Sequence, residues 1–179
     1  MGLSTVSKAL KVLEEDLIVD RQMGVRLVGP DKLLEALVDN FVRPSKEPRI
    51  QLKVPGDRAS VMQLLRARAD AVSLPIVATG LSSVSQYAVM QREDMLSVYC
   101  PDIATLRDSL NGKETDRFPN VELIESSEQP LFFDAREAEG FLWASPAQAY
   151  LELMAGDKRD QEAAEQVRDY LLRGSGGRG

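Results

Sequence analysis

The chain offers few side chains for catalysis, because its 179 residues include no histidine and a single cysteine, Cys100. The absence of histidine excludes Ser-His-Asp and Cys-His nucleophile systems, and it excludes the usual zinc sites. Carboxylates, lysines, tyrosines and hydroxyl groups remain for chemistry. One cysteine permits no internal disulfide bond, which fits a reducing cytoplasm.

One stretch, ATGLSSVSQ at residues 78–86, has the pattern of a phosphate-binding turn, in which a strand, a glycine and a helix start follow one another. Nucleotidyltransferases continue from such a turn into a strand with two carboxylates at alternate positions, where they hold metal ions for phosphoryl transfer. Here Ser97 and Tyr99 occupy those positions, and neither is a usual magnesium ligand. Asp102 follows the strand alone. We therefore expect, at most, a nucleotidyltransferase-like fold without the catalytic metal site, and we favour an ordinary strand-to-helix connection at Gly80.

Other acidic residues are interpreted as surface residues. Glu93 and Asp94 resemble a loop pair, and residues 125–128 resemble a polar turn. The sequence therefore predicts no catalytic residue, no metal ligand and no cofactor.

A second candidate site lies at the start of the chain, where residues 3–30 predict an amphipathic helix followed by a hairpin. Ser4 is the expected N-cap. An apolar stripe at helical spacing is expected from Val6, Ala9, Leu10, Leu13 and Leu17. Lysines lie toward the N-terminal end of this helix and acidic residues at its C-terminal end, opposite to the preference of the helix dipole. This order indicates another use for the lysines.

The hairpin consists of extended segments at 17–20 and 25–28, joined by a turn at 22–24 in which Gly24 supplies a positive φ. A helix followed by a basic hairpin is the second half of a winged helix-turn-helix, whose recognition helix contacts bases and phosphates near its N-terminus. The net charge of -6 confines any DNA contact to a local basic surface. The predicted DNA-binding residues are Ser4, Thr5, Ser7, Lys8, Lys11, Arg21 and Arg26. A solvated surface helix followed by an ordinary hairpin is the alternative.

A complete winged helix-turn-helix has two helices before the recognition helix, and only Met1 and Gly2 precede residue 3. We expect either a truncated chain or a gene start placed too late. The apolar stripe would then lack its usual cover, and we expect it to pair with the same stripe of a second copy in a homodimer.

The rest of the chain predicts an α/β (α+β) fold with a mixed sheet, because strand and helix patterns alternate from Ile50 onward. One of the expected strands is LFFDA at 131–135. The expected organisation is a partial winged-helix region at 1–42, a linker at 43–49, an α/β domain at 50–173 and a flexible tail at 174–179. No apolar run could span a membrane and no secretory signal precedes the first helix, so we expect a cytoplasmic protein.

Six segments, in order, carry a family resemblance: STVSKALKVLEEDLIV, GVRLVGPDKLLEAL, VATGLSSVSQYA, LSVYCPD, NVELIE and ASPAQAYLELMAGDKRDQEAAEQVRDYLL. Together they resemble the AbiEi-like antitoxins of type IV toxin–antitoxin systems. The resemblance implies an N-terminal winged helix and a C-terminal α/β domain. It also implies a repressor of its own operon that counters a nucleotidyltransferase-like toxin in abortive infection.

The partners expected from the resemblance are promoter DNA and a toxin protein or, indirectly, its mRNA product. Two other function classes stay open: a non-catalytic protein-interaction domain, and a nucleotidyl- or phosphoryl-transfer enzyme.

Overall fold

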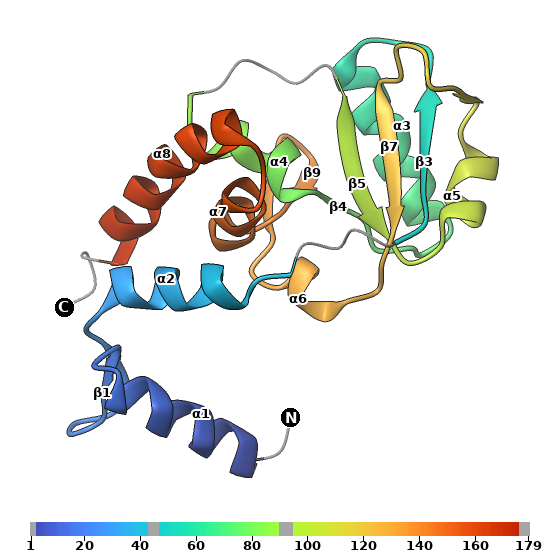
Figure 1. Ribbon diagram of the computed structural model, residues 1–179. Helices are drawn as coiled ribbons and strands as arrows, with labels where there is room; N and C mark the ends of the chain where they lie inside the picture. Colours follow the sequence, from blue (N-terminus) through green and yellow to red (C-terminus); the bar gives the residue numbers. More distant parts are fainter. Residues whose placement is uncertain (1–2, 43–46, 90–94, 176–179) are drawn as a thin grey trace. The chain divides into compact units, whose positions relative to one another are not determined.

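The computed structural model describes residues 3–42, 47–89 and 95–175 (Figure 1). The chain divides into two compact units, one of Met1–Phe41 with Leu172–Gly179 and one of Val42–Leu171. Parts of the predicted linker 43–49 and tail 174–179 lie outside the described residues, as do Glu93 and Asp94. No helix in the described ranges is long and apolar enough to cross a membrane.

The smaller unit contains helix α1 (Leu3–Glu15), a hairpin of β1 (Val19–Asp20) and β2 (Arg26–Leu27), and helix α2 (Pro30–Asn40). The hairpin strands are antiparallel, with Val19 opposite Leu27 and Asp20 opposite Arg26. Gly24 in the turn has a φ of 111°, as its position predicted. A helix and then a hairpin is the order that a recognition helix and wing require, and the winged-helix assignment itself stays a prediction.

The ends of α1 differ from the prediction. The helix begins at Leu3, so Ser4 lies in its first turn and is not the N-cap. At the other end, Leu17 adopts a left-handed φ of 57°. Ile18 N donates to Leu13 O at 2.8 Å and Leu17 N donates to Glu14 O at 3.1 Å, which is the pattern of a Schellman cap. Leu17 therefore ends the helix and lies outside the extended segment and the apolar stripe to which it was assigned.

The larger unit is built on a seven-stranded sheet in the order β6-β3-β7-β5-β4-β9-β8. Its strands are β3 (Arg49–Lys53), β4 (Val77–Ala78), β5 (Leu96–Cys100), β6 (Lys113–Glu114), β7 (Val121–Glu125), β8 (Arg136–Ala138) and β9 (Phe141–Trp143). The β5–β7 and β4–β9 pairs are parallel and the other pairs are antiparallel. The predicted α/β class with a mixed sheet is confirmed.

The helices of this unit are α3 (Arg58–Ala71), α4 (Gly80–Ser83) continued by a 3-10 turn, η1 (Val84–Gln86), α5 (Ile103–Ser109), α6 (Gln129–Phe132), α7 (Pro146–Met154) and most of α8 (Lys158–Ser175), whose residues from Leu172 onward belong to the smaller unit. The strand predicted for LFFDA at 131–135 is wrong. Its first two residues belong to α6, and Phe133 N then donates to Pro130 O in a turn. Pro130 stands in the first turn of α6, where its missing N–H costs nothing.

The two faces of the sheet have different partners. Helices α3 and α5 lie along one face of β3, β7 and β5 (Figure 1), where Leu52, Leu65, Val98, Leu106 and Leu123 belong to one buried apolar cluster. Because side chains alternate along a strand, Ser97 and Tyr99 point to the opposite face from Val98. Helices α4 and α7 contact each other at Gly80, which begins α4 directly after β4.

Candidate functional site

The polar residues predicted to contact DNA are accessible. All seven predicted residues are exposed: Ser4, Thr5, Ser7, Lys8 and Lys11 on α1, and Arg21 and Arg26 on the hairpin. The helix and the hairpin therefore present hydroxyl, ammonium and guanidinium groups, which are the donors used for phosphates and base edges.

Acidic neighbours contact three of the four basic side chains. Lys11 Nζ lies 3.7 Å from Glu15 Oε1, Arg21 Nη1 lies 3.5 Å from Glu14 Oε2, and Arg26 Nη2 lies 3.6 Å from Asp20 Oδ2. Such solvent-exposed pairs contribute little stability, so each cation can leave its carboxylate for a phosphate at small cost. Lys8 has no acidic partner within the described part of the chain.

Apolar side chains beside this surface are also uncovered. On α1, Val6 is 44% exposed, Ala9 is exposed, and Leu10 and Leu13 are half-buried. At the hairpin turn, Met23 is fully exposed. The apolar stripe of α1 is therefore only partly covered in the structure.

The turn at Gly80 is packed against α7. A Cβ on Gly80 would lie 2.8 Å from Gln148 O and 2.9 Å from Ala149 Cα, so only glycine permits this contact. Thr79 Oγ1 caps α4 by accepting from Ser82 N at 3.3 Å. Leu81 N donates to Glu152 Oε2 at 3.3 Å, so a carboxylate of the protein itself occupies the position where a phosphate would bind. These contacts are those of a tightly packed strand-to-helix connection.

The strand after this turn places Ser97 and Tyr99 in the interior, where they are 7% and 3% exposed. Tyr99 Oη donates to Glu152 Oε1 at 3.2 Å, and Glu122 of β7 lies beside Ser97 in the parallel pairing of β5 with β7. Sequence reasoning missed both glutamates, because they become neighbours of Ser97 only through sheet register and helix packing. Within the described residues, no three His, Cys, Asp or Glu side chains are arranged to hold a metal ion.

Asp102 has a structural role. Its carboxylate caps α5 by accepting from Thr105 N at 3.0 Å and from Thr105 Oγ1 at 2.6 Å. These hydrogen bonds lower the pKa of Asp102, and the bond from the Thr105 side chain contributes most. The lone carboxylate after the strand thus serves a helix start.

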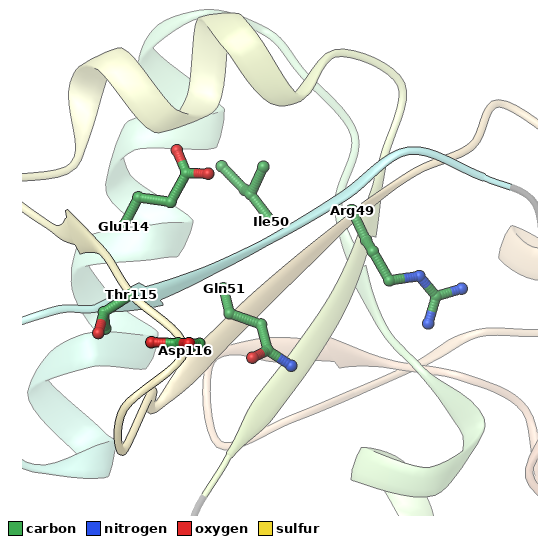
Figure 2. Close-up of a pocket in the computed structure, with 6 residues that line it drawn as sticks. All are labelled: Arg49, Ile50, Gln51, Glu114, Thr115 and Asp116. Atoms are coloured by element: carbon green, nitrogen blue, oxygen red, sulfur yellow. The ribbon is translucent and has the colours of Figure 1, made fainter.

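An open groove of about 420 Å³ lies along β3 near the edge strand β6. Figure 2 shows Arg49 and Gln51 on one side of β3 and Ile50 on the other. Glu114, Thr115 and Asp116 complete the lining. One guanidinium and two carboxylates give this groove no single charge sign, so it has no preference for a nucleic acid.

One comparison with known proteins finds a match. The family model described as a transcriptional regulator, the AbiEi antitoxin of a type IV toxin–antitoxin system, matches residues 26–173. The match includes β2, α2 and most of the larger unit, whereas α1 and Arg21 precede it. No curated protein and no solved structure matches the chain, so the nucleotidyltransferase-like fold stays a prediction.

Proposed function

The chain belongs to the AbiEi antitoxin family of transcriptional regulators from type IV toxin–antitoxin systems, and on this premise we propose that it binds and represses its own promoter. Such a regulator works in the cytoplasm, where its promoter lies. Family membership makes the chain a transcriptional regulator. The identity of its promoter and of the residues that contact the DNA is our proposal.

The observation that carries the DNA-binding proposal is the joint exposure of lysines on α1 and arginines on the following hairpin. Lys8 and Lys11 project from the N-terminal two thirds of α1, and Arg21 and Arg26 flank the turn of the hairpin. A recognition helix and wing would use these side chains for phosphates, with Ser4, Thr5 and Ser7 near base edges. The overall charge of -6 leaves the rest of the molecule poorly suited to DNA.

We assign the antitoxin effect to the larger unit, which contains most of the matched residues. The toxin that it counters is expected to be nucleotidyltransferase-like, and the effect is exerted on the toxin protein or, indirectly, through its mRNA product. Family membership alone supports this part of the proposal, so no residue is assigned to it. A growth assay in which a nucleotidyltransferase-like toxin is induced with and without residues 47–175 of this chain tests it.

We propose that the chain is not an enzyme. Ser97 and Tyr99 stand where transferases carry metal-binding carboxylates, and Glu152 fills the helix start at Gly80. Incubation with magnesium and each nucleoside triphosphate should give no transfer product. Metal-dependent transfer that Asp102→Asn abolishes would contradict this.

A promoter fusion tests repression in cells. A reporter behind the DNA upstream of the gene should be repressed by the chain and released by the Lys8→Ala/Arg26→Ala double variant. Lys113→Ala, which removes an exposed lysine on β6, is the matched control and should repress normally. Equal repression by the double variant and the parent would reject the assigned surface.

A further inference from the structure

Exposed apolar side chains gather on the hairpin of the smaller unit. Met23 in the turn is 102% exposed, Val25 is 61% exposed and Leu27 is 41% exposed. Single apolar residues scattered over a surface need no explanation, whereas a group of neighbouring ones indicates a contact with a partner. The tip of the hairpin is therefore a candidate contact surface.

The same tip carries positive charge. Residues 21–26 are RQMGVR, so Arg21 and Arg26 flank Met23 and Val25 with no acidic residue between them. Both arginines are exposed. Burial of the tip in an apolar protein pocket would remove both guanidinium groups from water, which is costly, whereas the phosphates of DNA would pair with them. An apolar tip between two arginines thus fits a nucleic acid better than an apolar protein surface.

The base of the hairpin is fixed on the smaller unit. Ile18 is 2% exposed, and its carbonyl oxygen accepts from Val28 N at 2.9 Å and from Gly29 N at 3.0 Å. Next to the turn, Gln22 N donates to Asp20 Oδ1 at 2.9 Å. Because these contacts order the hairpin before any partner binds, the tip would lose little conformational entropy on binding.

The position of the hairpin brings its tip to a second groove of the DNA. The hairpin lies at the C-terminal end of α1 (Figure 1), whereas the proposed base contacts come from the N-terminal part of this helix. With α1 in the major groove, the hairpin reaches across one phosphate backbone to the neighbouring minor groove, which is about 6 Å wide. Proteins that kink DNA insert apolar side chains between base steps from this groove, and methionine is one of the side chains that they use.

We propose that Met23 inserts between two base pairs from the minor groove and kinks the DNA at that step, an inference that rests on the proposed binding of DNA by α1 and the hairpin. Arg21 and Arg26 hold the tip in place through phosphates on either side of it. Pyrimidine–purine steps unstack and kink most easily, so Met23 selects a site with a TA or CA/TG step without a hydrogen bond to any base.

A short duplex of the DNA upstream of the gene, with a donor and an acceptor dye at its ends, tests the proposal, together with duplexes that carry 2-aminopurine at one step at a time. Binding of the parent chain should raise the energy transfer, because a kink brings the ends closer together. The fluorescence of 2-aminopurine should rise at one pyrimidine–purine step, because that step loses its stacking.

Met23→Gln keeps the length of the side chain but makes its end polar, so it should remove both signals and weaken binding about tenfold. The dependence of log affinity on log salt should stay the same, since Met23 contacts no phosphate. Met23→Leu, which remains apolar, should retain both signals. The matched control is Phe133→Ala, which removes an exposed apolar side chain of the larger unit and should change neither the signals nor the affinity.

Bound DNA that stays straight, or equal bending by Met23→Gln and the parent, would overturn the insertion of Met23 and leave the proposed promoter binding intact. Bending that Met23→Gln retains while it loses self-association in sedimentation would also overturn it, because the tip would then contact a second copy of the chain. A parent chain that does not bind the duplex would contradict the proposed function itself.

Discussion

Gly80 shows how a single residue can have a role that its neighbours in the sequence do not reveal. Followed by hydroxyl residues, it resembles part of a phosphate-binding turn. In the structure, the absence of a side chain instead admits the backbone of α7 at Gln148 and Ala149, almost seventy residues further along the chain. Local pattern could predict the turn, but the close approach depends on a packing contact that no short window of sequence contains.

Gly80→Ala should destabilise the larger unit. The added Cβ would lie 2.8 Å from Gln148 O, a backbone atom, so α4 and α7 must move apart. Overpacking of this kind costs about 1–3 kcal/mol, which urea denaturation would measure as a lower free energy of unfolding. Gly174→Ala in α8 is the control, because an added Cβ there would meet nothing within 4 Å apart from its chain neighbours and its own helix backbone, and it should not destabilise the protein. Equal stability of the Gly80→Ala variant and the parent would contradict the packing described for this turn.

Cys100 provides an internal probe of the same unit. Burial raises the pKa of its thiol to about 12, and its side chain is 0% exposed. Because the thiolate is the reactive form, a disulfide reagent at pH 8 should leave the folded protein unmodified and label it fully in urea. Rapid labelling of the folded chain at pH 8 would show that β5 is accessible, contrary to the structure.

At the scale of elements, periodicity predicted α1, the hairpin and most helices of the larger unit, because each has a strong local pattern. The predicted ends of α1 were wrong at Ser4, which lies inside a helix that begins at Leu3, and at Leu17, where a left-handed residue closes the helix through two backbone hydrogen bonds. The strand predicted at 131–135 was wrong because a short apolar run fits a strand and a helical turn equally well. Pro130 and the following backbone hydrogen bonds favour the turn.

Two helix caps should make stability depend on acid pH. Asp57 accepts from Ser60 N at 2.8 Å and Asp102 accepts from Thr105, and these hydrogen bonds lower the pKa of both carboxyls. Because the pKa values are lower in the folded protein, the stabilisation is present above the unfolded value of about 3.9 and is lost as pH falls through the folded values.

The double variant Asp57→Asn/Asp102→Asn should therefore have a lower free energy of unfolding than the parent at pH 7. Its free energy of unfolding should also fall less than that of the parent between pH 5 and 2. Urea denaturation at each pH measures both. Glu139→Gln, in an exposed turn, is the control. Parallel pH profiles for the double variant and the parent would contradict the assigned caps.

The apolar stripe of α1 leads to a prediction about assembly. Val6 is 44% exposed and Leu10 and Leu13 are only half-buried, although burying such a side chain contributes about 1.5–3 kcal/mol. We propose that two chains pair through this stripe. Sedimentation should show dimers or larger species at moderate concentration, and Leu10→Lys and Leu13→Lys should shift them to monomers. A parent chain that sediments as a clean monomer with α1 ordered would contradict the pairing.

At the scale of the whole molecule, the alternation of strands and helices was sufficient to predict an α/β fold with a mixed sheet. The strand order was not predictable, because β3 lies between β6 and β7 through contacts between segments about sixty or more residues apart. The same non-local register places Glu122 beside Ser97. By contrast, the candidate DNA-binding residues were accessible to sequence reasoning, since they lie within one helix and one hairpin.

The binding of the chain to the DNA upstream of its own gene, measured by fluorescence anisotropy at several salt concentrations, tests the central claim most directly. Each phosphate contact contributes roughly 0.9 to the slope of log affinity against log salt. The account predicts that Lys8→Ala/Arg26→Ala weakens binding on every sequence and lowers the slope by roughly 1.8, the sum for two contacts, whereas Lys113→Ala changes neither. Unchanged affinity and slope for the double variant would contradict the assignment of α1 and the hairpin as the DNA-binding surface.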